Sequence, residues 1–329
     1  MRKLGCLLLV LAVLSAAGAA DGMARGPDRK TVTGFYLDTV VTLSAYTDNV
    51  KVLDDALEEC GRYERLLSRT IEGSDIWRIN HAGGKPVEVS ADTIKILTLA
   101  RQVSEWSGGA FDVTIAPAAV LWDFRSGKTQ LPDAEALEAA AALVDYTRVA
   151  VEGNTVTLPE GMMLDLGAIA KGYIADALKA TLIDRGVKSG ILSLGGNVVT
   201  IGTKPDGKPW KIGIQDIDGR TGEYMLVAES SGGATVTSGT YERGFDLDGV
   251  HYHHLLDASS GWPVQNGLAS VSIFCEDSAL ADALSTAAFL LGPEKGLALI
   301  ESTDGAEAVF IRNDRTIICS SGAERYLAA

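Results

Sequence analysis

Residues 163–178 read MLDLGAIAKGYIADAL, and this stretch is the most informative about the fold. The pattern predicts a strand that ends at Asp165, a tight turn at a glycine and a helix that begins near Ala168. A helix start presents free backbone N–H groups and the positive end of the helix dipole, which suit an anion such as phosphate. Lys171 and Asp176, on the following turns, could meet the phosphate or hydroxyl groups of a nucleotide. A plain junction, with Asp165 as the helix cap, explains the spacing equally well.

The other predicted elements do not follow a strict strand–helix–strand rhythm. Alternating β-branched and aromatic residues predict strands at 34–46 and through most of 188–272, and a closing hairpin around Asn313-Asp314. The run LGGNVVTIG at 194–202 lacks the GxGxxG spacing, which excludes a Rossmann nucleotide site there. The predicted fold class is therefore α+β, with mixed or antiparallel sheets and packed helices. Helical spacing of apolar residues predicts the remaining helices at 48–67, 91–106, 133–144, 278–291 and 295–302.

Composition and charge exclude some classes of partner. The chain has 329 residues, of which 47% are hydrophobic and 22% charged, as in ordinary globular proteins. Its net charge of −14 disfavours nucleic acid and anionic membrane surfaces. Cys60, Cys275 and Cys319 have neither the spacing of a zinc site nor that of a disulfide framework, so we expect buried small hydrophobic residues.

The first twenty residues are typical of an export signal. Arg2 and Lys3 precede an apolar run at 4–14, and small residues at 17–20 offer a cleavage site. We expect residues 1–20 to be removed, residues 21–33 to form a flexible lead-in, and residues 34–329 to form one catalytic domain. An uncleaved signal that anchors the protein is the alternative. Either way, the protein is expected in the periplasm or cell envelope.

The predicted helix at 278–291 carries an unusual polar group within LADALSTAAFLLG. Asp282 and Thr286 stand four residues apart on one helical face, and Ser285 lies three residues from Asp282. Oxygen-only ligands of this kind suit Mg²⁺, which takes one or two carboxylates and leaves room for substrate phosphates. The alternative is a helix cap and a hydroxyl that bonds back to its own helix.

Three of the four histidines cluster in HYHHLLDASSGWP at 251–263. No cysteine or further histidine completes a zinc set of usual spacing. Strand alternation places His251 and His253 on one face and His254 on the other, with Leu256. A lone inward histidine suits a general base, although a structural histidine fits the pattern as well.

Two further segments carry weaker signals. TSGTYERGF at 237–245 places hydroxyls, a tyrosine and an arginine in a turn after a strand. GGAFDVTIAP at 108–117 is followed by Trp122 and Phe124, whose rings could stack on a flat ligand. Aromatic residues of this sort are more often part of a core.

These segments, in this order, resemble the ApbE family of FAD:protein FMN transferases. The resemblance extends over about residues 34–322, and an ordered series of motifs is far more specific than any one of them. The matching runs are SDIWRIN (74–80), GGAFDVTIAP with LW-F (121–124), DLGAIAKGYIAD (165–176), LGGN (194–197), TSGTYER (237–243), HHLLDASSGWPV (253–264) and ADALSTAAFLLG (281–292).

The resemblance implies a role for each matching position. Magnesium would be held by the Ala168 carbonyl, Asp282 and Thr286, and His254 would be the base. A Thr or Ser hydroxyl of a partner would attack the FMN-side phosphorus of FAD, AMP would leave, and FMN would stay on the partner. The family's usual acceptors are flavoprotein subunits of membrane redox complexes. The implied FAD contacts are Leu37, Thr70, Ala110, Phe111, Asp112, Asp165, Lys171 and Leu256.

The chain also departs from the family pattern. Ser285 stands where some members have a second metal carboxylate, and Leu37 begins a Leu-Asp-Thr run where many members read Met-Gly-Thr. Thr70 replaces a tyrosine of some transferases, which leaves hydrolysis of FAD to FMN and AMP open. No cysteine follows the apolar run, so no lipid anchor is expected. A magnesium-dependent FAD pyrophosphatase and a non-catalytic FAD-binding protein remain the alternatives.

Overall fold

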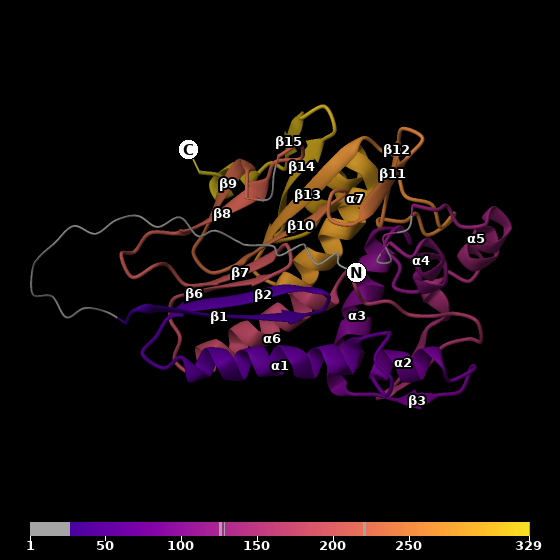
Figure 1. Cartoon of the computed structure of the whole chain (residues 1–329), viewed down its shortest axis with the longest axis horizontal. Helices are drawn as coiled ribbons and strands as arrows, with labels where there is room; N and C mark the ends of the chain where they lie inside the picture. The colour runs from indigo at the N-terminus through magenta and orange to yellow at the C-terminus, as the bar shows by residue number, and fades with distance from the viewer. Residues whose placement is uncertain (1–26, 125–126, 128, 220–221, 329) are drawn as a thin grey trace, which may run out of the picture.

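The computed structural model describes residues 27–124, 127, 129–219 and 222–328. The predicted export signal at 1–20 therefore lies outside the described residues. An antiparallel sheet of eight strands forms the centre of the molecule (Figure 1). In spatial order its strands are β1 (Arg29–Tyr36), β2 (Thr39–Tyr46), β6 (Gly190–Leu194), β7 (Asn197–Ile201), β10 (Ala234–Gly239), β13 (Leu268–Cys275), β14 (Glu307–Arg312) and β15 (Ile317–Cys319).

Helices cover one face of this sheet. The predicted helix at 91–106 is confirmed, those at 48–67 and 133–144 are confirmed with shorter bounds, and the helix predicted to begin near Ala168 begins at Ala170. Two short helices, α2 and α4, were not predicted, because six or seven residues are too few to show a helical period. The helices are α1 (Lys51–Leu67), α2 (Asp75–Asn80), α3 (Ala91–Trp106), α4 (Ala116–Trp122), α5 (Ala134–Ala141), α6 (Ala170–Asp184) and α7 (Ser278–Glu301).

Smaller sheets complete the fold. The hairpin of β8 (Trp210–Gln215) and β9 (Tyr224–Ser230) covers the second face of the large sheet near its β14 end. The other two sheets flank the helical side: β11 (Gly244–Leu247) with β12 (Val250–His253), and β3 (Val87–Glu88), β5 (Thr155–Thr157) and β4 (Ala150–Glu152). The α+β prediction with antiparallel sheets is therefore confirmed.

The prediction of a single strand at 34–46 is wrong. The chain turns back at Leu37 and Asp38, whose φ angles of 55° and 57° give the left-handed turn that matches hairpin twist. The turn has no Gly or Asn at its tip, and the alternation of β-branched and aromatic residues continues through it, so the sequence pattern did not indicate a turn. The first strand begins at Arg29, so residues 29–33 belong to the sheet and not to the lead-in.

The two helices predicted at 278–291 and 295–302 form one element with a break. Gly292 has φ 79° and precedes Pro293, and the helix continues beyond them to Glu301. Among the described helices, α7 is the one whose length and hydropathy would allow it to span a membrane, but 67% of its apolar window is buried. Its composition is therefore that of a core helix.

The closest helix packing joins α6 to the start of α7. A Cβ atom on Gly172 would lie 2.1 Å from the Ser278 carbonyl oxygen, so only glycine allows the two backbones to approach this closely. Asp176 of α6 accepts a hydrogen bond from Ala279 N at 2.8 Å, and Asp282 of α7 accepts one from Gly172 N at 2.9 Å. Each helix therefore supplies a carboxylate to the N-terminal turn of the other.

Gly172→Ala should weaken this crossing. The added methyl group must displace the backbone of α7, and overpacking of this kind costs about 1–3 kcal/mol or more. Urea unfolding followed by circular dichroism should show a lower midpoint. An unchanged midpoint would mean that the two helices do not approach as closely as described.

Candidate active site

The start of α6 and the buried face of α7 place a carboxylate and an ammonium group together. Asp282 is 2% exposed, and its Oδ1 lies 3.4 Å from Lys171 Nζ. The same ammonium group lies 3.3 Å from the Gly167 carbonyl oxygen. Gly172 N donates to Asp282 Oδ2, so Asp282 faces the start of α6, as the resemblance to the ApbE family implied. The helix begins at Ala170, two residues later than expected, because residues 167–169 form a turn before it.

Three hydroxyl groups continue this site toward the sheet. Ser238, at the end of β10, lies 2.7 Å from Ser285 Oγ and 3.2 Å from Thr286 Oγ1. Ser285 Oγ donates to the Asp282 carbonyl at 2.8 Å, so its proton is used within its own helix. Ser238 then donates to Ser285, and Thr286 donates to Ser238. The back-bonding alternative is therefore correct for Ser285, and Thr286 keeps lone pairs that can face a cation.

The donor set at this site consists of oxygen atoms. It contains the buried Asp282 carboxylate, the Gly167 carbonyl and neutral hydroxyls. In the described part of the chain, no three His, Cys, Asp or Glu side chains gather as a metal-ligating group. A hard cation that takes one carboxylate and fills its other positions from phosphate and water fits these residues. The Lys171 ammonium, shared by the Gly167 carbonyl and Asp282, shows that the two oxygens can face one cation.

Leu37, Thr70 and Asp165 lie around the end of α1. Glu64, in the last turn of α1, accepts a hydrogen bond from Leu37 N at 2.7 Å and so holds the hairpin tip. Thr70 follows α1 by three residues and is exposed. Its neighbour Arg69 donates through Nε to Asp165 Oδ2 at 2.7 Å. The structure therefore gathers these three predicted FAD contacts at one end of one helix.

The predicted contacts at 110–112 and at Leu256 use their side chains mainly for structure. Asp112 accepts hydrogen bonds from Thr114 and from Tyr146 N, which occupies both carboxylate oxygens. Phe111 is 1% exposed and Leu256 is 5% exposed. These side chains therefore leave mainly backbone atoms for a ligand. The segment still reaches the site, because Asp165 N donates to the Val113 carbonyl at 2.8 Å.

A surface pocket borders Ala110 on its other side. Its volume is about 700 Å³, and it lies between the end of α3, the turn at 257–259 and the C-terminal half of α7. The aromatic pair proposed for ring stacking is not available to it. Trp122 is 1% exposed, donates to the Gly261 carbonyl at 2.7 Å and stacks on Phe124 within the protein.

A hydrogen bond to the Arg243 carbonyl holds His254 in one tautomer. Its Nδ1 lies 3.2 Å from the Arg243 carbonyl oxygen, which can only accept, so Nδ1 carries the proton and Nε2 keeps its lone pair. Burial, followed by the positive charge of Arg243, lowers the pKa of His254 to about 3. The more buried His253 differs, since its Nε2 contacts the Val264 carbonyl and its ring packs edge-on against Phe289.

Sequence reasoning missed several residues of this site. Glu242 has an exposed side, yet the protein around it raises its pKa to about 7 by desolvation, against the opposing charges of Lys171 and Arg243. Ser238 and Glu242 both lie in the TSGTYER segment, whose density of polar groups after a strand was the available signal. Arg69 gave no local signal, because its partner is 96 residues away.

The lowered pKa of His254 predicts that the imidazole stays neutral at physiological pH. Its folded pKa lies below the ordinary 6.5, so the unfolded chain takes up the proton first and stability falls as the pH drops from 6.5 toward 3. Nitrogen-15 spectra should show His254 protonated at Nδ1 and unchanged from pH 8 to pH 5. A titration midpoint near 6.5 would contradict the lowered pKa, and protonation at Nε2 would contradict the tautomer assignment.

Comparisons with known proteins identify the family of this chain. The model of the ApbE family matches residues 37–310. A FAD:protein FMN transferase of Treponema pallidum is 33% identical over 95% of this chain and 92% of its own length. One of Klebsiella pneumoniae is 36% identical over 85% of this chain and 88% of its own.

Solved structures give the same result. The ApbE protein of Thermotoga maritima has a TM-score of 0.85 and 31% identity, covering 92% of this chain and all of its own. The flavin transferase ApbE of Vibrio cholerae has a TM-score of 0.83 and 26% identity, covering 91% and 99%. The family match spans well over half of the sequence and includes every segment of the site. The chain therefore belongs to the ApbE family and is a transferase of the FAD:protein FMN transferase type.

Proposed function

We propose that this enzyme transfers FMN from FAD to a Thr or Ser hydroxyl of an acceptor protein in a Mg²⁺-dependent reaction. The observation that carries the proposal is the buried Asp282 carboxylate, held with Lys171 at the start of α6. A helix start and an ammonium group attract a pyrophosphate, and a buried carboxylate with nearby neutral oxygens attracts a divalent cation. The pyrophosphate and the divalent cation are both parts of a complex between Mg²⁺ and FAD.

The residues of the site divide the work as follows. The Ala168 carbonyl, Asp282 and Thr286 would hold Mg²⁺, which when bound neutralises charge on the pyrophosphate. Lys171 would bind a phosphate oxygen, and Asp165, which is paired with Arg69 next to Thr70, would contact FAD. His254 accepts the acceptor hydroxyl's proton at Nε2, the atom that its tautomer leaves free. The hydroxyl oxygen forms a bond to the FMN phosphorus, and the bond from that phosphorus to the bridging oxygen breaks, releasing AMP.

Hydrolysis of FAD is the second candidate reaction. Thr70 is small and exposed next to the Arg69–Asp165 pair, which leaves room for a water molecule in place of an acceptor hydroxyl. The same attack by water would give free FMN and AMP. A protein that only binds FAD would leave the dinucleotide intact.

One incubation separates these outcomes. The purified protein is mixed with FAD, Mg²⁺ and a candidate acceptor subunit, and products are followed by chromatography and intact-protein mass. Transfer gives equal amounts of AMP and flavinylated acceptor, and hydrolysis gives AMP with free FMN. If FAD remained unchanged both in the presence and in the absence of an acceptor, neither transfer nor hydrolysis would be correct.

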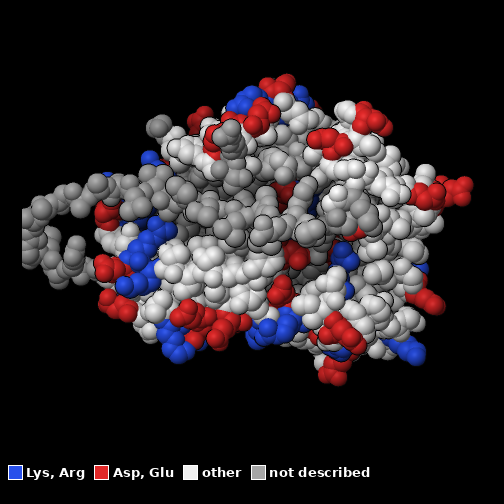
Figure 2. All heavy atoms as spheres, in the orientation of Figure 1, with Lys and Arg blue, Asp and Glu red and all other residues white. Residues whose placement is uncertain are grey.

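The acceptors proposed are flavoprotein subunits of membrane redox complexes, outside the cytoplasm. The export signal of the sequence supports this location, and N-terminal mass analysis of protein from its native host would test it through a start near Ala20 or Asp21 without lipid. The surface gives no support to a nucleic-acid partner. On the face shown in Figure 2, acidic and basic side chains are interspersed, without a continuous basic strip among the described residues.

Asp282→Ala should abolish most AMP release while leaving the fold intact by circular dichroism. Loss of one charged partner of the transition state commonly costs on the order of 100-fold in rate. Thr286→Ala should be milder, because water can replace a neutral ligand. Asp206→Ala removes an exposed carboxylate outside the site and is the matched control. Near-normal turnover of Asp282→Ala across a Mg²⁺ titration would contradict the site assignment.

A further inference from the structure

The segment from Ser68 to Asn80 grips the backbone that carries Asp165 at two points; we call it the 68–80 clamp. Arg69 Nε donates to Asp165 Oδ2 at 2.7 Å. Asn80 accepts from Leu164 N at 2.7 Å and donates to the Leu164 carbonyl at 2.9 Å. Two consecutive residues at the entrance of the site are therefore fixed by side chains more than eighty positions earlier.

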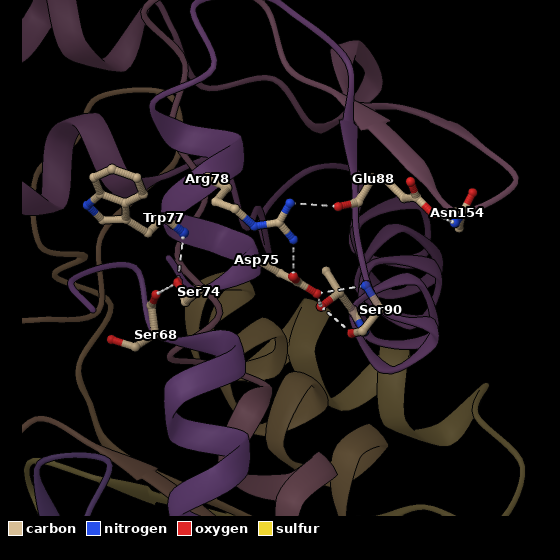
Figure 3. A network of polar contacts seen from close by, with 9 residues as sticks. Ser68, Ser74, Asp75, Trp77, Arg78, Glu88, Ser90 and Asn154 are labelled. Carbon is tan, nitrogen blue, oxygen red and sulfur yellow. Dashed lines mark hydrogen bonds and ion pairs between the residues drawn. The ribbon is translucent and has the colours of Figure 1, made fainter. Parts of the chain in front are cut away.

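The clamp is itself anchored to the start of α3 (Figure 3). Asp75 is 4% exposed, and its Oδ2 accepts hydrogen bonds from Ser90 N at 2.8 Å and from Thr93 Oγ1 at 2.6 Å. Arg78 pairs with Asp75 Oδ1 and donates to the Glu88 carbonyl at 2.8 Å. Because these groups are satisfied within the protein, they fix α2 without touching the site.

At the other end, α2 is tied back to the residues beside Arg69. Ser74 caps α2 by accepting from Trp77 N at 2.9 Å, and its hydroxyl donates to the Ser68 carbonyl (Figure 3). The position of Arg69 therefore follows from that of α2, and so does the position of Asn80 at the end of the same helix.

Asp165 transmits this placement to the turn that follows it. Its Oδ1 accepts a hydrogen bond from Gly167 N at 2.8 Å, while Oδ2 is held by Arg69. The turn then presents the Gly167 carbonyl to Lys171 and leads to the Ala168 carbonyl. A shift of the Asp165 carboxylate would thus move the oxygens on which cation and phosphate binding depend.

Arg69 also neutralises the negative charge of Asp165. Asp165 is partly buried, with 26% of its side chain exposed, and it precedes the turn that leads to the proposed pyrophosphate site. A carboxylate left unpaired there would repel the ligand, whereas the guanidinium group neutralises it and fixes its plane. The two terminal nitrogens of Arg69 make no hydrogen bond to any other described residue.

We propose that Arg69 and Asn80 are positioning residues, which hold Asp165 and the 165–168 turn in the geometry that binds FAD and Mg²⁺. This inference rests on the proposed function. Arg69 acts through Asp165, not by touching the dinucleotide. Supporting residues of this kind commonly change affinity or activity by about 10–100-fold when they are replaced.

A double-mutant cycle tests the route of action. FAD affinity is measured by calorimetry, with and without Mg²⁺, for the wild type, Arg69→Gln, Asp165→Asn and the double variant. Arg69→Gln should weaken FAD binding about tenfold and raise the Mg²⁺ concentration for half-saturation. In the Asp165→Asn background the same change should cost less than about twofold, because the interaction is already lost. Arg101→Gln removes a guanidinium group from the exposed Arg101–Glu105 pair on α3 and is the control.

Asn80→Ala gives an independent check on the 68–80 clamp, because it should lower FAD affinity with little change in kcat. Additive effects of Arg69→Gln and Asp165→Asn would overturn the proposal, because Arg69 would then contact the ligand itself. A loss of affinity matched by an equal loss in Arg101→Gln would overturn it too. Failure of the wild type to bind FAD would contradict the proposed function, whereas normal binding by Arg69→Gln would contradict only the role of the clamp.

Discussion

The hydrogen bond from Gly172 N to the Asp282 carboxylate is the interaction on which the rest of the site depends. A carboxylate that is 2% exposed must be paired, and here a helix N-terminus and the Lys171 ammonium supply the pairing. The approach requires glycine at 172, since any side chain would meet the backbone of α7. Because Asp176 completes a reciprocal contact with Ala279, the crossing that builds the site also joins two core helices.

Apart from Glu242, whose raised pKa favours its protonated form, the elements around this crossing supply neutral oxygens. Ser238 and Thr286 present hydroxyls, and Ser285 uses its proton on its own helix. Glu242 is a second carboxyl group near Asp282, and its pKa, raised to about 7, reduces the repulsion between the two in the absence of a cation. A divalent cation would then take the remaining ligands from the substrate, which couples metal binding to dinucleotide binding. His254 keeps a free Nε2, which is the atom that would accept the proton in the proposed reaction.

The sequence predicted the parts of this arrangement that depend on local pattern. The α3 helix and the start of α6 to within two residues followed from spacing, and the facing of Asp282 toward that start was implied by the family resemblance. The β1–β2 turn was not predicted, because Leu37 and Asp38 adopt a left-handed conformation although neither is a glycine. The roles of Arg69 and Asn80 were not predicted for another reason. Their partners lie 96 and 84 residues away, and the periodicity of a sequence does not indicate such contacts. The structural roles of Phe111 and Asp112 were equally invisible, since a motif shows residue types but not which atoms are already engaged.

The central claim is that cation and pyrophosphate meet at the crossing of α6 and α7. Crystals grown with FAD and Mn²⁺, measured at the manganese absorption edge, test it most directly. An anomalous peak about 2–2.3 Å from both the Ala168 carbonyl oxygen and an Asp282 carboxylate oxygen, with the FAD pyrophosphate beside Lys171, is the predicted result. Manganese bound elsewhere, or FAD whose pyrophosphate lies away from the start of α6, would contradict it.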